Sequence, residues 1–118
     1  MTPRIINKNP QFPNLEEVDK VIHESARLII MSHLYLVESA DFLFLMHQTD
    51  LTFGNLSSHM KKLEEAGYIE VHKHFVDRRP RTTLNLTPAG HTAFKAYREK
   101  LRSILDQIDS IDSINSKE

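Results

Sequence analysis

The sequence predicts a mainly α-helical α+β domain, in which short helices precede a β-hairpin and one long helix follows it. Three observations support this fold class. Apolar residues recur at helical spacing as far as Ala66, alternate with polar residues after Gly67, and return to helical spacing from Phe94 onward. With 118 residues and no Cys, the chain is long enough for one hydrophobic core and has neither a disulfide nor a thiolate zinc site.

Composition excludes several classes of protein. Hydrophobic residues make up 40% of the chain and charged residues 26%, as in ordinary globular domains, so a disordered or fibrous chain is excluded. No apolar run reaches the roughly 18 to 20 residues of a membrane span, and the N-terminus lacks the pattern of a secretory signal. We therefore expect a cytoplasmic protein without membrane contact.

The formal net charge of -1 hides an uneven distribution of charge along the chain. Residues 1–53 have 4 basic and 7 acidic side chains, residues 54–104 have 10 and 5, and residues 105–118 have 1 and 4. A chain of near-zero total charge can still present a positive face, and that face is what a polyanion meets. The net charge therefore does not exclude a nucleic-acid partner.

The N-terminal segment is expected to be an arm followed by a helix. Residues 1–13 contain Pro3, Pro10 and Pro13 and no apolar periodicity, so we expect an extended N-terminal arm. Asn14 can cap a helix with acidic residues in its first turn. The apolar face of that helix would consist of Leu15, Val18 and Ile22.

Three more helices are expected before residue 67. Residues 25–37 are apolar around most of a helix circumference, which indicates a central helix buried on several sides. A break and cap at residues 39–41 precede one compact helix over residues 42–46 and a tight turn over residues 49–52.

The last of these helices has local start and stop residues. Thr52 is a good N-cap for a helix that runs to Ala66, and Gly67 would end it in the left-handed conformation. Together with the compact helix before it, this segment forms a candidate helix-turn-helix.

A hairpin is expected after Gly67. Residues 68–75 and 81–86 alternate between apolar and polar side chains, and residues 76–80 connect them. The side chains expected to face the core are Ile69, Val71, Phe75, Leu84 and Leu86.

Thr87 followed by Pro88 predicts the start of the long last helix. Its apolar residues fall at spacings of 3 and 4, an a/d pattern typical of a helix that packs along a partner helix. These residues are Phe94, Tyr97, Leu101, Ile104, Ile108 and Ile111. We expect the first five to form a homodimer interface, although the same face could instead cover the chain's own helices. From Ser110 onward Ser, Asp and Asn accumulate, and the helix is expected to fray.

The helix over residues 52–66 has one apolar face and one polar face. Its apolar stripe consists of Phe53, Leu56, Met60 and Leu63, and the polar residues of interest are Thr52, Asn55, Ser57, Ser58, Lys61 and Lys62. Small polar side chains at the start of a helix suit entry into a DNA groove, because nothing bulky keeps the helix from the base edges. The two lysines lie one turn later, where phosphates would flank the groove. The alternative is an ordinary solvated face.

The connector of the hairpin has the highest density of positive charge in the sequence. Arg78, Arg79 and Arg81 surround Pro80, with only Asp77 nearby. Three guanidinium groups on one stiff loop repel one another, and phosphates or a narrow minor groove would relieve that repulsion. A merely solvated turn is the alternative.

Two separated motifs resemble a known family. The run LTFGNLSSHMKKLEEAGYIEV at residues 51–71, followed by RPRTTLNLTPAG at residues 79–90, resembles winged-helix transcriptional regulators of the MarR/ArsR-like superfamily. The likeness is greatest to the small group that consists of little more than the DNA-binding domain. Residues 21–28 resemble the opening helix of that group, so the likeness spans roughly residues 18–101.

The resemblance implies a winged helix-turn-helix homodimer that places one recognition helix per subunit in successive major grooves of double-stranded DNA. The recognition helix maps onto residues 52–67 and the wing onto residues 75–83. Residues 14–90 would form the DNA-binding domain, and residues 91–118 the dimerisation helix and frayed tail.

Two positions depart from the family pattern. Larger MarR proteins have an Asp-x-Arg motif in the wing where this chain has Arg78 and Pro80, so wing contacts depend on its own arginines. Phe53 stands where related sequences often have a polar or basic residue. It could meet a thymine methyl group or simply pack, and we leave its role open.

The expected function is a homodimeric repressor that binds a pseudo-palindromic operator without a cofactor. Ser57, Ser58 and His59 point about 100° apart on a helix and cannot form a catalytic relay, so we expect no enzyme. His72 and His74 are two imidazoles without a third ligand, so we expect no metal site. A winged helix that binds protein is an alternative, and regulation by an unidentified small-molecule effector stays possible.

Overall fold

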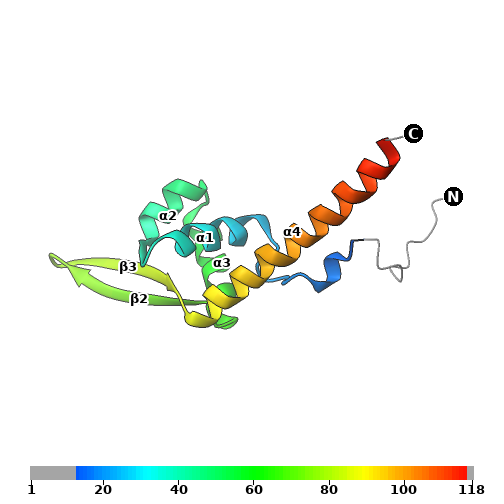
Figure 1. Cartoon of the computed structure of the whole chain (residues 1–118). Helices are drawn as coiled ribbons and strands as arrows, with labels where there is room; N and C mark the ends of the chain where they lie inside the picture. Colours follow the sequence, from blue (N-terminus) through cyan, green and yellow to red (C-terminus); the bar gives the residue numbers. More distant parts are fainter. Residues whose placement is uncertain (1–12, 117–118) are drawn as a thin grey trace.

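The structure is a computed structural model that describes residues 13–116, so nearly all of the expected N-terminal arm lies outside the described residues. The elements follow the chain in this order: η1 (Leu15–Glu17), α1 (Ser25–Leu36), β1 (Ala40–Asp41), α2 (Phe42–Thr49), α3 (Phe53–Glu65), β2 (Ile69–Val76), β3 (Arg79–Leu86) and α4 (Pro88–Ser116). The strands form one antiparallel sheet in the order β1-β3-β2. Figure 1 shows the β2–β3 hairpin and the end of α4 projecting from opposite sides of the helices. This architecture confirms the predicted fold class.

The core lies where α1 meets the other helices and the base of the hairpin. The side chains of Ile30, Met31 and Leu34 on α1 are fully buried, and they pack with buried residues of every longer element. The expectation that α1 is buried on several sides is wrong for its last turn, because Leu36 is 82% exposed. Apolar side chains therefore extend over more of the α1 surface than the other described residues cover.

The helix expected after Asn14 is a single 3-10 turn, η1. Asn14 does cap it, since its side chain accepts a hydrogen bond from the backbone N–H of Glu16. The helix does not continue, because Asp19 Oδ1 accepts hydrogen bonds from the backbone N–H groups of Val21 and Ile22 and so forms a turn of its own.

The helix-turn-helix is confirmed in its local detail. Asp41 caps α2 by accepting from the backbone N–H groups of the next helix residues, and Asp50 turns the chain with a φ of 57°. Thr52 Oγ1 accepts from the N–H of Asn55 at the start of α3. Gly67 has a φ of 80°, the left-handed conformation expected after the helix.

The hairpin is longer than expected and its turn is tighter. The connecting turn is only Asp77 and Arg78, so Pro80 lies inside β3 opposite Phe75. The expectation that Phe75 faces the core is wrong: it is 74% exposed, because the two strands extend beyond the helices that would cover it. Ile69, Leu84 and Leu86 are buried, as expected, and Val71 is half-buried.

The sheet has a short third strand, β1, which the sequence pattern does not indicate. Ala40 pairs with Leu84 and Asp41 with Thr83. Two residues are too few to show an alternating pattern. The pairing ties the start of α2 to the base of the hairpin, and so fixes the helix-turn-helix relative to the wing.

The last helix, α4, begins as predicted and extends further than predicted. Thr87 Oγ1 accepts from the N–H of Gly90, and Pro88 is the first helical residue. The sequence predicts fraying from Ser110, yet the helix continues to Ser116. Among residues 13–116, no helix combines the length and apolar character needed to span a membrane.

Candidate nucleic-acid interface

The first turns of α3 present small polar side chains to solvent. Asn55 and Ser58 are exposed, and Ser57 is half-buried. Thr52 is also exposed, and although its oxygen accepts the capping hydrogen bond, its hydroxyl can still donate. The end of α3 predicted to approach base edges is therefore free of bulky polar groups.

The opposite face of α3 fixes the helix to the core. Leu56 and Leu63 are fully buried, and Met60 is nearly so. Phe53, predicted to continue this stripe, is instead 66% exposed. Its ring lies against Phe42, with the two ring centroids 5.0 Å apart and the planes inclined at 60°. The first turn of α3 extends past the core, which is why Phe53 remains at the surface.

Two adjoining hollows lie between α3 and the hairpin, and we call them together the α3–hairpin surface. Their volumes are about 730 and 590 Å³, and both are lined by Phe42, Phe53 and Thr82. The first is also lined by Asp41, Leu43, Val76, Asp77, Arg79, Pro80 and Arg81. The second is also lined by Ser57, Met60, Lys61, Glu64, Val71 and Lys73.

Four basic side chains line the α3–hairpin surface, and among the residues that the structure describes only one of them has an acidic partner. Arg81 Nε lies 3.5 Å from Asp41 Oδ1, and the Arg81 side chain is 51% exposed, so its charge is partly compensated. Within residues 13–116 no ion pair is formed by Lys61, Lys73 or Arg79. Three acidic side chains also line this surface: Asp41, Asp77 and Glu64. The hollow toward the hairpin turn thus has equal numbers of basic and acidic side chains, and the excess positive charge of the lining lies in the other hollow, with Lys61 and Lys73.

The two residues of the hairpin turn, Asp77 and Arg78, are both charged and both have an uncommon backbone conformation. Asp77 and Arg78 have φ values of 51° and 67°. Positive φ at both central positions is the pattern of a type I′ hairpin turn, in which Asn or Asp followed by Gly is usual. The strands and their register hold Arg78 at the tip in this uncommon conformation, next to Arg79.

The structure brings together some of the predicted DNA-binding residues and separates others. Ser57, Lys61, Arg79 and Arg81 line the α3–hairpin surface. Thr52, Asn55 and Ser58 lie on the exposed part of α3, and Arg78 lies at the hairpin tip.

Lys62, a predicted site residue, lies outside the α3–hairpin surface, and Lys73, which was not predicted, lies on it. Lys62 lines a different hollow, with Lys20, Arg27 and Glu65 on the side of α3 toward α1. Lys73 is absent from the predicted site residues, yet it lies on β2 in the same hollow as Lys61. Lys73 is two residues after Val71 and therefore shares its face of β2, but that this face lies toward α3 follows only from the structure.

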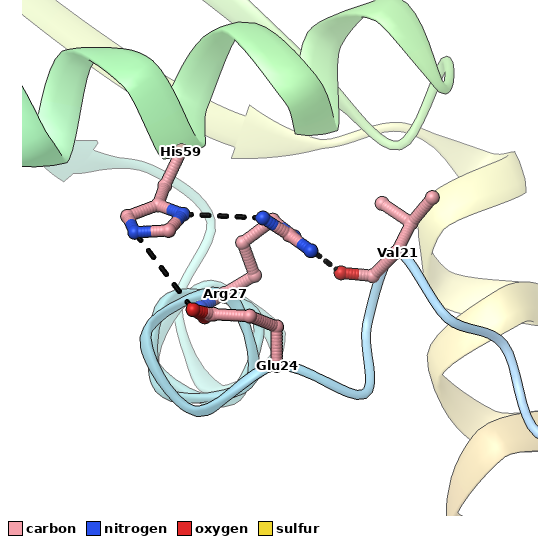
Figure 2. A network of polar contacts seen from close by, with 4 residues as sticks. All are labelled: Val21, Glu24, Arg27 and His59. Atoms are coloured by element: carbon pink, nitrogen blue, oxygen red, sulfur yellow. Dashed lines mark hydrogen bonds and ion pairs between the residues drawn. The ribbon is translucent and has the colours of Figure 1, made fainter.

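A polar network holds α3 to the start of α1 (Figure 2). His59 of α3 lies between two side chains of α1 or its cap: its Nδ1 is 3.2 Å from Arg27 Nη1, and its Nε2 is 3.9 Å from Glu24 Oε2. Because the guanidinium of Arg27 donates, His59 Nδ1 accepts, and the ring proton is on Nε2. Arg27 Nε also donates to the backbone oxygen of Val21 at 2.5 Å.

Glu24 is the anion of this network, and Arg27 is its cation. Burial alone would raise the pKa of Glu24, but hydrogen bonds from the backbone N–H groups of Arg27 and Ala26, with electrostatic attraction to the nearby His59 ring and the Arg27 guanidinium, outweigh it and lower that pKa below its usual value. Glu24 Oε1 accepts from the Arg27 N–H at 3.0 Å and so caps α1 as a carboxylate. The network thus fixes α3 from the side opposite the hairpin.

The two hairpin histidines have different surroundings. His72 Nε2 lies 2.9 Å from Asn85 Oδ1, and Asn85 Nδ2 donates in turn to Glu70 Oε1 at 3.2 Å. His74 is exposed and pairs with Arg81 in the strand register. The His72 ring is therefore part of a hydrogen-bonded chain across the hairpin.

The predicted dimer residues fall into two groups. Phe94, Tyr97 and Ile104 are buried within this chain: the ring centroids of Phe94 and Tyr35 are 5.3 Å apart, and His23 Nδ1 lies 2.7 Å from the Tyr97 hydroxyl. These three therefore cover the chain's own core, the alternative left open by the heptad pattern.

Leu101 is half-buried and Ile108 is exposed. Two further apolar residues of α4, Leu105 and Ile114, are also exposed. Among residues 13–116, the exposed apolar side chains of α4 thus begin beyond Ile104, later along the helix than the sequence pattern indicates.

Comparison with known proteins agrees with this geometry. The family described as a winged helix DNA-binding domain matches residues 26–105. An uncharacterised protein of Methanocaldococcus jannaschii is 38% identical over 78 residues, which are 66% of this chain and 85% of that protein. The solved transcriptional regulator homologue of Pyrococcus horikoshii OT3 is 34% identical with a TM-score of 0.72, covering 75% of this chain and 88% of that one.

The fold is also similar to that of a MarR-family regulator with lower sequence identity. A MarR-family transcriptional regulator of Enterococcus faecalis V583 is 21% identical with a TM-score of 0.62, covering 89% of this chain and 99% of that one. At this identity the likeness shows the fold alone. The chain belongs to the winged helix DNA-binding domain family, with the fold of MarR-family transcriptional regulators.

Proposed function

We propose that this protein is a transcriptional repressor that binds a specific double-stranded DNA sequence as a homodimer. The observation that supports this most is the α3–hairpin surface, where a polar helix face adjoins Lys61, Lys73 and Arg79, which form no ion pair with any residue of 13–116. Phosphates would compensate those charges, and base edges would bond the polar side chains of α3. Repression would follow from occlusion of the promoter.

Affinity and sequence choice come from different residues in this proposal. Lys61, Lys73 and the hairpin arginines release counterions from the phosphates, which strengthens binding to any duplex. Asn55, Ser57 and Ser58 lie where a helix inserted in the major groove meets base edges. Lys62 contacts a phosphate of the DNA backbone from the other side of α3.

The dimer is proposed on the exposed apolar face near the end of α4. Leu105 and Ile108 lie on the part of α4 that projects from the domain, and both are exposed among residues 13–116. Ile114 is exposed too, but it is nine residues after Leu105 and lies on the opposite side of the helix. Burial of Leu105, Ile108 and half-buried Leu101 against a second copy would remove them from water. A twofold dimer then predicts a pseudo-palindromic operator with half-sites about 10 base pairs apart, or a multiple of that.

Selection of bound sequences from a random duplex pool tests the proposal. The expected result is one enriched motif with twofold symmetry, and footprinting should show protection of both halves. Enrichment of a single asymmetric half-site would contradict the dimer. A pool without any enrichment would contradict sequence-specific binding and favour the protein-binding alternative.

Light scattering tests the dimer separately. At micromolar concentration the expected mass is twice that of one chain, and Ile108→Asp should shift it toward the monomer, because the charge would lie in an apolar interface. Asp106→Ala, on the same helix, is the control and should keep the dimer. A wild-type monomer under these conditions would contradict this part of the proposal.

A further inference from the structure

Phe53 is a large apolar side chain that lines both hollows of the α3–hairpin surface, and it has no role in the proposed contacts to phosphates and base edges. It is the first residue of α3, is 66% exposed, and lines both hollows. A Phe side chain that is this exposed lacks most of the stabilisation that burial of its apolar surface would provide. The two hollows around it combine apolar side chains, such as Met60 and Val71, with polar or charged ones, such as Ser57, Lys61 and Arg79.

The ring of Phe53 is held in place on one side. It packs on Phe42, itself buried, in a tilted arrangement with ring centroids 5.0 Å apart, a favourable geometry for an aromatic pair. The residue after it is Gly54, around which nothing lies within 4 Å of the position of a Cβ. The first turn of α3 can therefore approach another surface closely, with the Phe53 ring fixed in orientation.

We infer that Phe53 is a specificity-determining residue that recognises the 5-methyl group of a thymine in the major groove. This inference rests on the proposed function. A Phe ring cannot hydrogen-bond to a base edge, and the thymine methyl is the apolar group that the major groove presents. Ser57, one turn later on the same hollow, would bond to the neighbouring base or phosphate.

Replacing thymine by deoxyuridine tests this contact, because only the methyl group is removed. Each thymine of the selected duplex is replaced in turn, and binding of the full chain is titrated. We expect affinity to fall about four-fold at one thymine per half-site, the fold-change that corresponds to burial of one methyl group. Replacement in both half-sites should lower affinity about fifteen-fold, since the two contacts are far apart.

Two variants assign the effect to Phe53. Phe53→Ala should bind the thymine and deoxyuridine duplexes equally, and Phe53→Leu should keep part of the preference. Phe44→Ala is the matched control, since Phe44 is also an exposed Phe but lies on α2 outside both hollows. It should keep the full preference for thymine.

The possible failures are distinct. Wild-type binding that is insensitive to every thymine methyl would overturn the inference and leave the proposed function intact. A preference that persists in Phe53→Ala would also overturn it. Absence of binding to any duplex would overturn the proposed function and this inference together.

Discussion

The base and the tip of the β2–β3 hairpin are formed by the same two strands and have opposite surroundings. At the base, Ile69, Leu84 and Leu86 are buried. At the tip, Phe75 is exposed, and Arg78 and Arg79 form no ion pair within residues 13–116. The contrast indicates that the base of the hairpin contributes to stability and its tip to binding. Substitutions at the base should therefore change the free energy of unfolding, and substitutions at the tip should change the affinity for DNA.

The largest effect is expected at the base, from Gly90→Ala. A Cβ at Gly90 would lie 2.1 Å from the backbone oxygen of Tyr68, and that oxygen also accepts from the N–H of Thr87. Backbone on both sides must move, and we expect a loss of about 3 kcal/mol in the free energy of unfolding, measured by urea denaturation.

Gly54→Ala is the matched control for that variant. Nothing lies within 4 Å of a Cβ at Gly54, and an Ala within a helix is favoured over Gly by about 0.5 to 1 kcal/mol. We expect unchanged or slightly higher stability. Equal unfolding midpoints for Gly90→Ala and the wild type would refute the close approach of α4 to the hairpin base.

At the tip, Arg78→Ala combined with Arg79→Ala should change binding and leave stability alone. The slope of log affinity against log salt concentration should flatten by about one unit for each arginine, because each releases counterions from one phosphate. The free energy of unfolding should stay within about 0.5 kcal/mol of the wild type. Arg102→Ala, an exposed charge on α4, should leave the slope unchanged; an equal flattening there would remove the hairpin's special role.

A smaller effect on stability is expected from Tyr68→Phe at the base. The Tyr68 hydroxyl donates to Asp19 Oδ2, and loss of this bond should cost about 1 kcal/mol. Burial, the hydrogen bond to Asp19 and its negative charge raise the pKa of Tyr68 to about 12.

The pH dependence of that variant follows from the raised pKa. The unfolded chain would ionise Tyr68 near 10, so the stabilisation by the neutral hydroxyl is complete below pH 10 and is lost as pH rises toward 12. The stability difference between Tyr68→Phe and the wild type should shrink over this interval, in chemical denaturation at a series of pH values. A constant difference would show that Tyr68 and Asp19 are not coupled.

The smallest effect is expected from Asp41→Asn, next to the hairpin. Asp41 partly compensates Arg81, and its removal should make the salt dependence of binding steeper by less than one unit. The amide oxygen of Asn can still cap α2, so stability should change by only a few tenths of a kcal/mol. A flatter slope would mean that Arg81 does not contact phosphate.

Local signals in the sequence are enough to predict the helix-turn-helix. Thr52, Gly67 and Thr87 each act on backbone groups within a few residues of themselves, so their effect does not depend on the rest of the fold. For this reason the amino-acid sequence alone places the start of α3, its end and the start of α4.

Features that depend on tertiary packing could not be predicted. The heptad pattern of α4 shows which residues are apolar, but not that Phe94 and Tyr97 are covered by their own chain. Neighbouring lysines on α3 point about 100° apart, so which of Lys61 and Lys62 lies in the hollow with Lys73 depends on how α3 is docked. Likewise, the early end of η1 depends on the turn at Asp19.

The most direct test of the central claim is the salt dependence of binding to a random-sequence duplex. Four cations on or beside the α3–hairpin surface form no ion pair within residues 13–116: Lys61, Lys73, Arg78 and Arg79. We predict that log affinity falls linearly with log salt concentration with a slope of about -3 to -4 per chain. Affinity that does not change with salt, or no measurable binding at low salt, would contradict the assignment of this surface to DNA.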